Sequence, residues 1–475
     1  MLKSGGAWLA AAGAFATGAN AVVRGVNLGG WLVLEPWWVS RIARHNGMTP
    51  SIFNVSGTSY DSEWALCNGL GKQKCLSTLQ NHWSTFYTRD DIKQIQAAGL
   101  NSIRIPLGYW AVDLLDFEPY VSGQYQYLSQ AVQWAKEFDL TVMIDIHGAP
   151  GSQNGWEETG IVGGIEFPLN QSNTDRTLNV LKNLTEEFTK EMYGGAVTNI
   201  ELMNEPIFEL AKLQTFYTAG AEVVSVANSS GINTTFHDAF YNPPNWKNYD
   251  PLNMNSGSNG KYLTLDTHQF WAFPPLDTLS VPEILGRICA FGLELKQLDT
   301  GILPTIVGEW SLSTGHTANS TTDSGQDRDK RTWFRELFEA QNAAYTPNGP
   351  GQASIGWYFW SWKTEYDIDA WSYRKGVEQG YIPSNISDPS TYAYPITTDN
   401  TGCIDGSFKW QAPEIAQASS SATSSAGSKP TSTGTATSGS ASAASTTASG
   451  AANVSPASGV SAALVIALAY LVCSL

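Results

Sequence analysis

The feature that most constrains this chain is a regular alternation of short β-branched runs and longer helical patterns along most of its length. Eight short apolar runs are candidate strands, at residues 22–27, 102–106, 141–146, 197–203, 233–237, 263–267, 305–309 and 354–359. Helical patterns separate most of them, at residues 89–98, 127–138, 174–193, 209–227, 281–299 and 331–344. Such alternation is typical of repeated βα units around a parallel sheet. Eight strands in one domain predict an α/β fold of the closed (β/α)₈ TIM-barrel type.

A doubly wound open sheet is the alternative arrangement of alternating strands and helices. Open sheets that bind dinucleotides carry a GxGxxG turn after the first strand. No such motif follows residues 22–27. We therefore expect the barrel, in a single domain that spans residues 22–415.

Both ends of the chain carry addressing signals outside this domain. Lys3, an apolar run at residues 7–16 and the small residues 19–21 predict a secretory signal peptide over residues 1–21. Residues 416–459 are almost wholly Ser, Thr, Ala and Gly, which predicts a disordered stalk because too little apolar surface can be buried. Small residues before an apolar tail predict that residues 460–475 direct attachment of a glycosylphosphatidylinositol anchor. A plain hydrophobic tail anchor is the alternative.

The cysteines support a secretory route. Cys473 lies in the terminal tail, which leaves an even set for disulfides in an oxidising compartment. We predict a local Cys67–Cys75 bridge and a long-range Cys289–Cys403 bridge, although the sequence alone permits three ways of pairing these cysteines. A zinc site is the competing interpretation, and it is weak because the sequence has no CxxC or HxxxH spacing. Asn-x-Ser/Thr acceptors for glycosylation occur at Asn54, Asn170, Asn183, Asn228, Asn233, Asn319 and Asn385.

The charge and the aromatic content point toward one class of ligand. The formal net charge is −16 and no basic cluster is present, so no nucleic-acid partner is expected. Only 15% of residues are charged whereas 12% are aromatic, with 18 Trp, which suits a protein that lays flat rings against neutral sugars. Most of these tryptophans are expected to fill a large core.

Polar or aromatic residues follow most of the predicted strands. In a (β/α)₈ barrel the βα loops converge at the carboxyl ends of the strands, where chemistry is placed. The residues at these ends are Asn27 and Glu35, Arg104, Asp145 and His147, Asn204 and Glu205, His268, Glu309 and Trp360. Glu205 and Glu309 follow the fourth and seventh strands and should face each other across the mouth. Hydrolysis of an acetal needs such a pair, one carboxyl to protonate the departing oxygen and one to attack the anomeric carbon.

The wider motifs resemble those of a known family. Asn204-Glu205-Pro206 and Gly308-Glu309-Trp310 are similar to the acid/base and nucleophile motifs of glycoside hydrolase family 5, clan A. The sequences NLGGWL at 27–32, IRIP at 103–106, HGAPGSQNG at 147–155 and FWSWKTE at 359–365 resemble its fungal exo-β-1,3-glucanase branch. The likeness spans roughly residues 23–403 and is weaker around residues 46–59 and 242–259.

The resemblance implies a role for each of these residues. Glu205 would be the acid/base and Glu309 the nucleophile of a retaining double displacement, with no metal and no organic cofactor. Arg104 is the cation placed to hold the pKa of Glu309 low. Asn204 would bind the sugar 2-hydroxyl, where hydrogen bonds tighten in the transition state.

Other residues would shape the sugar subsites. By the resemblance, His147 and His268 line the first subsite, Glu35 recognises the non-reducing end and Trp360 forms the floor. Trp156 and Phe273 would grip the next sugar at the entrance. The competing interpretation is structural: core histidines, a barrel ion pair at Arg104 and locally packed loop aromatics. His45, His82, His237 and His316 receive no role.

One position departs from the family pattern. The family reads His-x-Tyr after the sixth strand, whereas this sequence reads His268-Gln269-Phe270. In the family this tyrosine hydroxyl hydrogen-bonds the nucleophile. Its absence here would therefore raise the pKa of Glu309 or slow glycosylation. We expect an active enzyme with altered efficiency, because both carboxylates and Arg104 are present.

The expected activity is release of glucose from the ends of a β-1,3-glucan polysaccharide or oligosaccharide, in cell-wall remodelling. We expect a monomer at the cell surface that meets the membrane only through its lipid anchor. One alternative is an endo-β-1,6-glucanase or another β-glucosidase of the same clan, because loops set specificity. The other is a wall-binding protein without turnover, for which Phe270 is the motivating feature.

Overall fold

The computed structural model describes residues 22–36, 48–228, 231–256, 262–315, 327–397 and 402–410, apart from 406 and 409. The predicted signal peptide, stalk and anchor signal, at residues 1–21, 416–459 and 460–475, lie outside the described residues. None of the helices within these ranges has the length and apolar character needed to span a bilayer.

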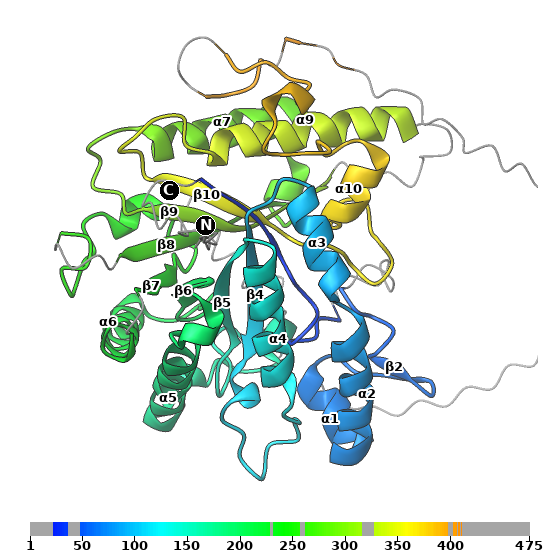
Figure 1. Cartoon of the computed structure of the whole chain (residues 1–475), viewed down its shortest axis with the longest axis vertical. Helices are drawn as coiled ribbons and strands as arrows, with labels where there is room; N and C mark the ends of the chain where they lie inside the picture. Colours follow the sequence, from blue (N-terminus) through cyan, green and yellow to red (C-terminus); the bar gives the residue numbers. More distant parts are fainter. Residues whose placement is uncertain are drawn as a thin grey trace, which may run out of the picture.

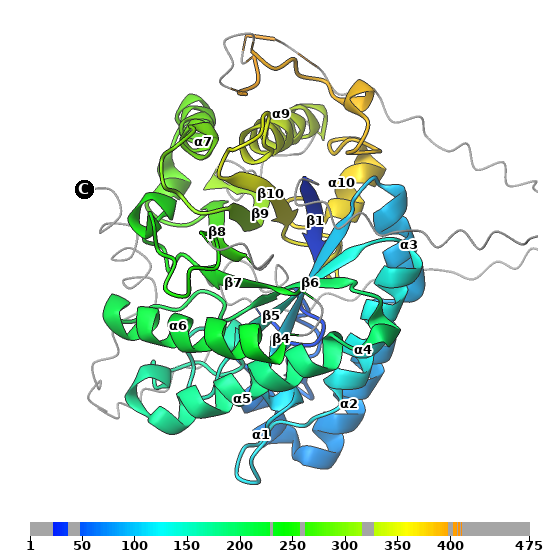
Figure 2. The ribbon, with the colours of Figure 1, turned by 60° about the vertical axis from the view of Figure 1, so that its left-hand side comes forward.

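Eight parallel strands close into a barrel at the centre of the molecule (Figure 1). The order around the barrel is β1-β10-β9-β8-β7-β6-β5-β4, so successive barrel strands lie side by side. Figure 2 shows the helices around the outside of these strands. The predicted (β/α)₈ fold is therefore confirmed. The strands are β1 (Val23–Asn27), β4 (Ser102–Gly108), β5 (Thr141–Gly148), β6 (Val197–Glu201), β7 (Asn233–His237), β8 (Leu263–Trp271), β9 (Thr305–Thr314) and β10 (Ser354–Phe359).

All eight predicted strands are present, and the differences lie at their ends. β8 and β9 continue past the predicted ends at residues 267 and 309, whereas β6 stops at Glu201. β8 and β9 are longer than predicted because the two strands remain paired beyond their apolar runs. His268 on β8 lies in register with Glu309 on β9. Several polar residues of the mouth therefore belong to strands, which fixes their positions more firmly than loops would.

The helices cover the outside of the barrel. The six predicted helical patterns correspond to α3–α7 and α9, and α1, α2 and α10 were missed. α2 has only a narrow buried stripe, at Cys75, Leu79 and Trp83, in an otherwise polar sequence, and α1 and α10 are short. The helices are α1 (Glu63–Leu70), α2 (Lys72–Thr85), α3 (Arg89–Ala97), α4 (Gln124–Glu137), α5 (Gln171–Phe188), α6 (Leu210–Ala227), α7 (Val281–Lys296), α9 (Asp327–Tyr345) and α10 (Tyr373–Gln379). A small antiparallel hairpin joins β2 (Asn54–Val55) to β3 (Thr58–Ser59).

Local sequence signals explain where some of these elements begin. α7 starts at a capping box in which Ser280 and Glu283 bind each other's backbone N–H groups, with Pro282 in the first turn. The connection from β7 to β8 has no α-helix among its described residues. It contains the short 3₁₀ helix η5 (Pro243–Trp246), which begins with two prolines.

The barrel interior is filled by side chains. Met143, Ile306 and Tyr358 come from β5, β9 and β10 and form one small apolar cluster. Because β5 and β9 are not neighbours in the sheet, these side chains meet across the inside of the barrel.

Both predicted disulfides are confirmed. Cys67 and Cys75 join α1 to α2 within the first βα connection. Cys289 and Cys403 join α7 to the segment that follows the barrel. The second bridge spans 114 residues and ties the end of the domain back onto its helical layer.

Candidate active site

Arg104 organises the polar side chains at the mouth of the barrel. It comes from β4 and is 0% exposed. Its Nη1 donates to Glu309 Oε1 at 2.7 Å and to Asn27 Oδ1 at 3.0 Å. Its Nη2 donates to Asn204 Oδ1 at 2.9 Å, and its Nε donates to Glu201 Oε2 at 2.9 Å. The planar guanidinium thus holds side chains from β1, β9 and the end of β6 in one arrangement.

Two buried acidic residues beside Arg104 were missed in the sequence. Glu201 binds Arg104, and Asp266 Oδ1 accepts a hydrogen bond from the Gly308 backbone N–H at 2.7 Å. A Cβ on Gly308 would lie 2.0 Å from Asp266 Oδ2, so the glycine before Glu309 leaves room for this carboxylate. The available signal was a single carboxylate in each of two buried strands, which is costly unless it is paired.

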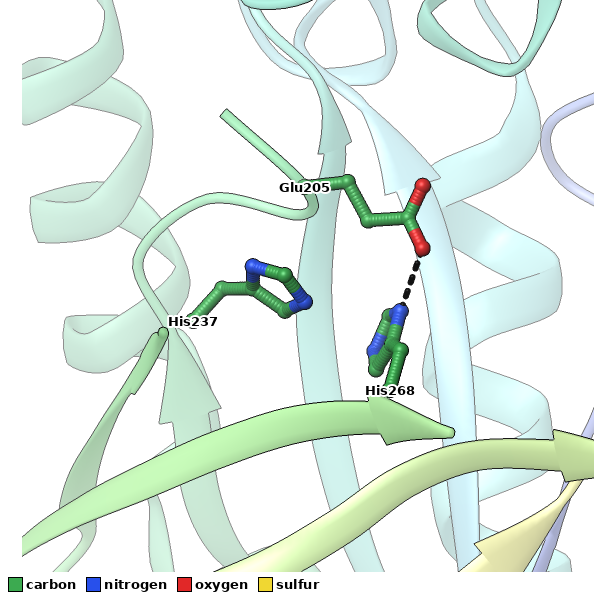
Figure 3. Close-up of side chains that lie close together, drawn as sticks. All are labelled: Glu205, His237 and His268. Atoms are coloured by element: carbon green, nitrogen blue, oxygen red, sulfur yellow. Dashed lines mark hydrogen bonds and ion pairs between the residues drawn. The ribbon is translucent and has the colours of Figure 1, made fainter. Parts of the chain in front are cut away.

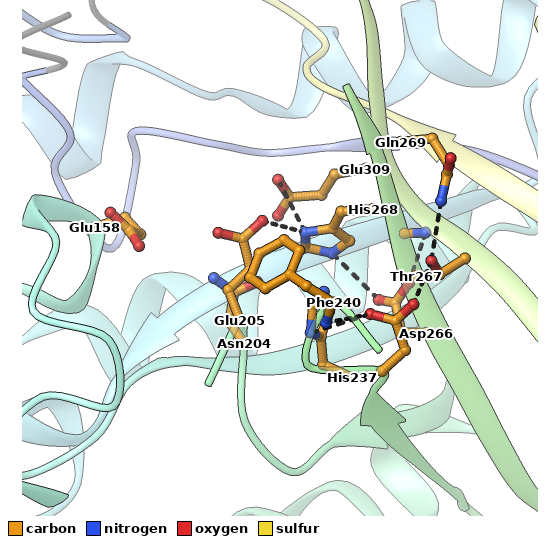
Figure 4. Close-up of polar contacts among 12 residues, drawn as sticks. Glu158, Asn204, Glu205, His237, Phe240, Asp266, Thr267, His268, Gln269 and Glu309 are labelled. Atoms are coloured by element: carbon orange, nitrogen blue, oxygen red, sulfur yellow. Dashed lines mark hydrogen bonds and ion pairs between the residues drawn. The ribbon is translucent and has the colours of Figure 1, made fainter. Parts of the chain in front are cut away.

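The two glutamates meet at His268, as Figure 4 shows. Nδ1 of His268 lies 2.5 Å from Glu205 Oε1 and 3.6 Å from Glu309 Oε2. The distance between these two carboxylate oxygens therefore cannot exceed the sum of their distances to His268 Nδ1. That limit is shorter than the roughly 6.5 Å at which the carboxyl spacing of inverting glycosidases begins. The nearest carboxylate oxygens of Glu205 and Glu309 therefore lie closer together than that spacing.

The backbone at Glu205 adopts a conformation that few side chains tolerate. Its φ is 44°, in the left-handed region, and Pro206 follows directly. The side-chain amide of Asn154 donates to the Glu205 carbonyl at 3.0 Å and to Glu158 Oε1 at 2.8 Å. Backbone strain of this kind costs about 1–3 kcal/mol and is concentrated at functional sites. Here it turns the Glu205 side chain from the end of β6 into the mouth.

Burial raises the pKa of Glu309 to about 7, which corrects the expectation that Arg104 would hold it low. The positive charges of His268 and Arg104 do oppose the rise, while the nearby Glu205 adds to it. Arg104 divides its charge among several carboxylates, since its Nη2 also lies 2.8 Å from Glu201. It therefore cannot offset the lost hydration of Glu309 alone.

Side chains from the end of β5 and from the segments after β1 and β10 form another part of the mouth. His147 Nδ1 donates to Asp145 Oδ2 at 2.6 Å, and its Nε2 lies 3.9 Å from Glu35 Oε1. The imidazole stacks on Trp360, with ring centroids 5.7 Å apart and planes inclined by 7°. The structure thus brings together Glu35, His147 and Trp360, which the family resemblance assigns to one sugar subsite.

The two predicted entrance aromatics lie with different partners. The Trp156 ring centroid lies 6.1 Å from that of Phe240, and the Phe273 centroid lies 5.9 Å from that of Phe270. Each is partly exposed. Their grip on a sugar stays a prediction.

His237 received no role from the sequence, yet it lies fully buried beside the site. Its ring centroid is 4.4 Å from that of His268 (Figure 3). Its Nδ1 accepts a hydrogen bond from the Ala239 backbone N–H at 3.0 Å. Burial, with the charges of His268 and Arg104, lowers the pKa of His237 well below its usual value, so the ring is neutral. Its place at the end of β7 was the signal that could have identified it.

Two groups of side chains have the composition of metal ligands. In each group, one potential ligand atom per side chain lies within 4.8 Å of the others. The first group is Glu205, His237 and His268, and the second is Glu201, Asp266 and His268. In the first group the Ala239 N–H occupies Nδ1 of His237, so the proton lies on Nε2 and that nitrogen is a donor. In the second group Arg104 Nη2 lies 2.8 Å from Glu201 and Arg104 Nε lies 3.8 Å from Asp266, so a cation is already present beside both carboxylates. These contacts favour a polar network over a metal centre.

Comparison with known proteins agrees with the motifs. The profile of the Cellulase family (glycosyl hydrolase family 5) matches residues 67–234. The probable glucan 1,3-beta-glucosidase A of Aspergillus fumigatus is 36% identical over 402 residues, covering 78% of this chain and 89% of that protein. The glucan 1,3-beta-glucosidase of Lachancea kluyveri is 34% identical over 414 residues, covering 77% of this chain and 88% of that protein.

A solved structure shares the fold. The rutinosidase from Aspergillus niger has a TM-score of 0.61, covers 76% of this chain and 98% of its own, and is 22% identical in sequence. At this identity the likeness concerns the fold alone. The relatives, the family profile and the barrel confirm the resemblance indicated by the motifs around Glu205 and Glu309. The chain therefore belongs to glycosyl hydrolase family 5 and is a glycosidase.

Proposed function

We propose that this glycosidase is an exo-acting β-1,3-glucanase that releases glucose from the non-reducing ends of β-glucans. The observation that carries the proposal is the meeting of Glu205 and Glu309 at one imidazole, His268, which defines a single reaction centre. The names of the A. fumigatus and L. kluyveri relatives support the β-1,3 linkage.

The short carboxylate spacing supports a retaining double displacement. Glu309 attacks the anomeric carbon while Glu205 protonates the departing oxygen, and a glycosyl-enzyme forms. A water molecule then gives a proton to Glu205 and attacks the same carbon, so the bond to Glu309 breaks. Glucose leaves with its original configuration.

The surrounding contacts support recognition of a terminal sugar. Oδ1 of Asn204 accepts from Arg104, which leaves the amide nitrogen to donate to the sugar 2-hydroxyl. Glu35 and His147 are both nearly inaccessible, at 1% and 2% exposure. Buried polar groups at one end of a subsite bind the hydroxyls of a chain terminus and obstruct a chain that continues.

The product profile on defined glucans tests the linkage and the mode of attack. Glucose is expected as the sole early product from laminarin, with no release from pustulan. Longer oligosaccharides from laminarin at early times would overturn the exo assignment. Release from pustulan alone would favour the β-1,6 alternative.

Chemical rescue tests the roles of the two glutamates. Glu309→Gln is expected to remove turnover of laminarin and of aryl β-glucosides. Glu205→Ala should still react with an aryl β-glucoside that has a good leaving group, and azide should restore turnover as β-glucosyl azide. An α-configured azide product would overturn the retaining mechanism.

We also propose that the protein is secreted and tethered to the cell surface by a lipid anchor. The proposal rests on the sequence features of residues 1–21 and 416–475. The two disulfides, which are favoured in oxidising compartments, support it. Phosphatidylinositol-specific phospholipase C is expected to release the protein from intact cells. Retention, while a known anchored protein is released, would count against the anchor.

A further inference from the structure

His237 carries a buried hydrogen-bond donor that has no use in the reaction described so far. A neutral imidazole has one acceptor nitrogen and one donor nitrogen. Because Nδ1 of His237 accepts from the Ala239 backbone, the proton must lie on Nε2. This Nε2 is inaccessible and has no hydrogen-bond partner among the described residues. A buried donor of this kind marks a position for an acceptor atom of a ligand or for a water molecule.

The donor is directed at the acid/base. Figure 3 shows a ring nitrogen of His237 directed toward the space between Glu205 and His268. One polar atom from each of these three side chains lies within 4.8 Å of the other two. An oxygen atom centred among three points with that spacing lies within roughly 2.8 Å of each, which is a normal hydrogen-bond distance.

The ring is held in place from several sides. The Tyr217 hydroxyl donates to the His237 carbonyl at 2.7 Å. The ring of Phe240 lies edge-on, with centroids 5.2 Å apart. Together with the Ala239 contact, these interactions fix the direction of the Nε2–H before any substrate arrives. Such preorganisation is what stabilises charge that develops on a reacting oxygen.

We infer that the Nε2–H of His237 donates a hydrogen bond to the oxygen that exchanges a proton with Glu205. In the first step this is the glycosidic oxygen, whose bond to the anomeric carbon breaks as Glu205 protonates it. In the second step it is the water oxygen, which bonds to the anomeric carbon as Glu205 takes its proton and Glu309 leaves. The inference rests on the proposed two-glutamate reaction and adds a donor from β7 to it.

Two substitutions separate this role from a structural one. His237→Asn can place its side-chain oxygen where Nδ1 accepts from the Ala239 N–H but has no donor at the Nε2 position, whereas His237→Gln can place its amide N–H at the Nε2 position but has no acceptor at the Nδ1 position. The substrates are phenyl β-glucoside, a poor leaving group, and 2,4-dinitrophenyl β-glucoside, a good one. The measurements are kcat/KM on both substrates and Tm for each variant.

Loss of the Nε2–H donor should lower kcat/KM mainly for the substrate with the poor leaving group. His237→Asn is expected to lower kcat/KM about tenfold for the phenyl glucoside, the worth of one hydrogen bond, and much less for the dinitrophenyl glucoside. Its Tm should stay at the wild-type value. His237→Gln should keep the wild-type leaving-group dependence while its Tm falls.

The reverse pattern overturns the inference. A histidine that only supports the fold gives normal kinetics in His237→Asn and a loss of Tm and activity in His237→Gln. If His237→Asn does not fold, His237→Ala, which also lacks the donor, takes its place: a steeper leaving-group dependence in His237→Ala than in His237→Gln supports the donor role, and equal dependence refutes it. Failure of wild-type protein to cleave either aryl glucoside would instead refute the proposed function.

Discussion

Glu309 combines burial with opposing charges, and this balance governs how the enzyme responds to pH. Burial raises its pKa to about 7, while His268 and Arg104 act in the other direction. Phe270, two residues beyond His268 on β8, has no hydroxyl with which to add a further opposing contact. A nucleophile must be ionised to attack, so activity should fall on the acid side as Glu309 takes up a proton.

Phe270→Tyr is expected to move the acid limb of the kcat/KM profile to lower pH. A phenol that donates to the Glu309 carboxylate favours its charged form and so lowers its pKa. One charge-assisted hydrogen bond contributes ~1.5 kcal/mol, or about tenfold in kcat/KM on the acid side. The measurement is hydrolysis of an aryl β-glucoside across the pH range. Phe138→Tyr, at the end of α4, is the control, and an unshifted limb in Phe270→Tyr would refute the prediction.

His82 gives the folded state a pH dependence that is separate from catalysis. Its Nε2 donates to the Gly30 carbonyl at 2.8 Å, and burial lowers the pKa of His82 from 6.5 to about 4. Between these pH values the unfolded chain binds a proton at this ring and the folded chain does not. Stability contributed by the neutral ring is therefore complete above pH 6.5 and falls as the pH falls toward 4. The loss is on the order of 3 kcal/mol.

His82→Gln should flatten this dependence, because an amide keeps a donor for Gly30 but does not titrate. Urea unfolding at neutral pH and near pH 4 measures the difference in the free energy of unfolding. This difference is expected to be smaller in the variant by about 2 kcal/mol or more. Equal differences in the two proteins would show that His82 does not carry the effect.

At the scale of elements, the approach of α7 to α9 depends on one glycine. A Cβ on Gly292 would lie 2.7 Å from Cα of Ala344 on α9, so any side chain there must push the helices apart. Gly286 is on the same helix, and a Cβ there would have no atom within 4 Å. The two glycines therefore offer a matched test of helix packing.

Gly292→Ala is expected to lower the free energy of unfolding by about 1–3 kcal/mol through overpacking. Gly286→Ala should raise it by about 0.5–1 kcal/mol, because alanine restricts the unfolded chain and favours the helix. Thermal unfolding of both variants measures the contrast. Similar changes in Tm for the two variants would mean that α7 and α9 can move apart without loss of stability, which would contradict the prediction.

At the scale of the whole molecule, the two disulfides close loops of very different length. Cys67 and Cys75 are separated by 8 residues, whereas Cys289 and Cys403 are separated by 114. By loop entropy alone, opening the short bridge costs about 2.5 kcal/mol and opening the long bridge about 5 kcal/mol. Replacing each pair by serines and measuring denaturant unfolding tests this order, and a larger loss from the short bridge would contradict it.

The sequence by itself predicted the barrel and placed two candidate glutamates at its mouth, whereas the choice among the three possible cysteine pairings was decided by the structure. Strand and helix periodicities are local, so eight short apolar runs separated by helical patterns were enough to predict the closed sheet. The motifs around residues 205 and 309 are local as well. α1, α2 and α10 were missed because their apolar positions are too few or too irregular to mark a face.

The tertiary structure alone decided how the site is tuned. The pKa of Glu309 depends on how one guanidinium from β4 divides its charge among carboxylates from other strands, and on how much water is excluded. The approach of His237 to Glu205, and the separate partners of Trp156 and Phe273, also join residues that are distant along the chain. Periodicity records which face of an element is buried, but electrostatic energy and hydrogen bonding depend on distances that exist only once the barrel has closed.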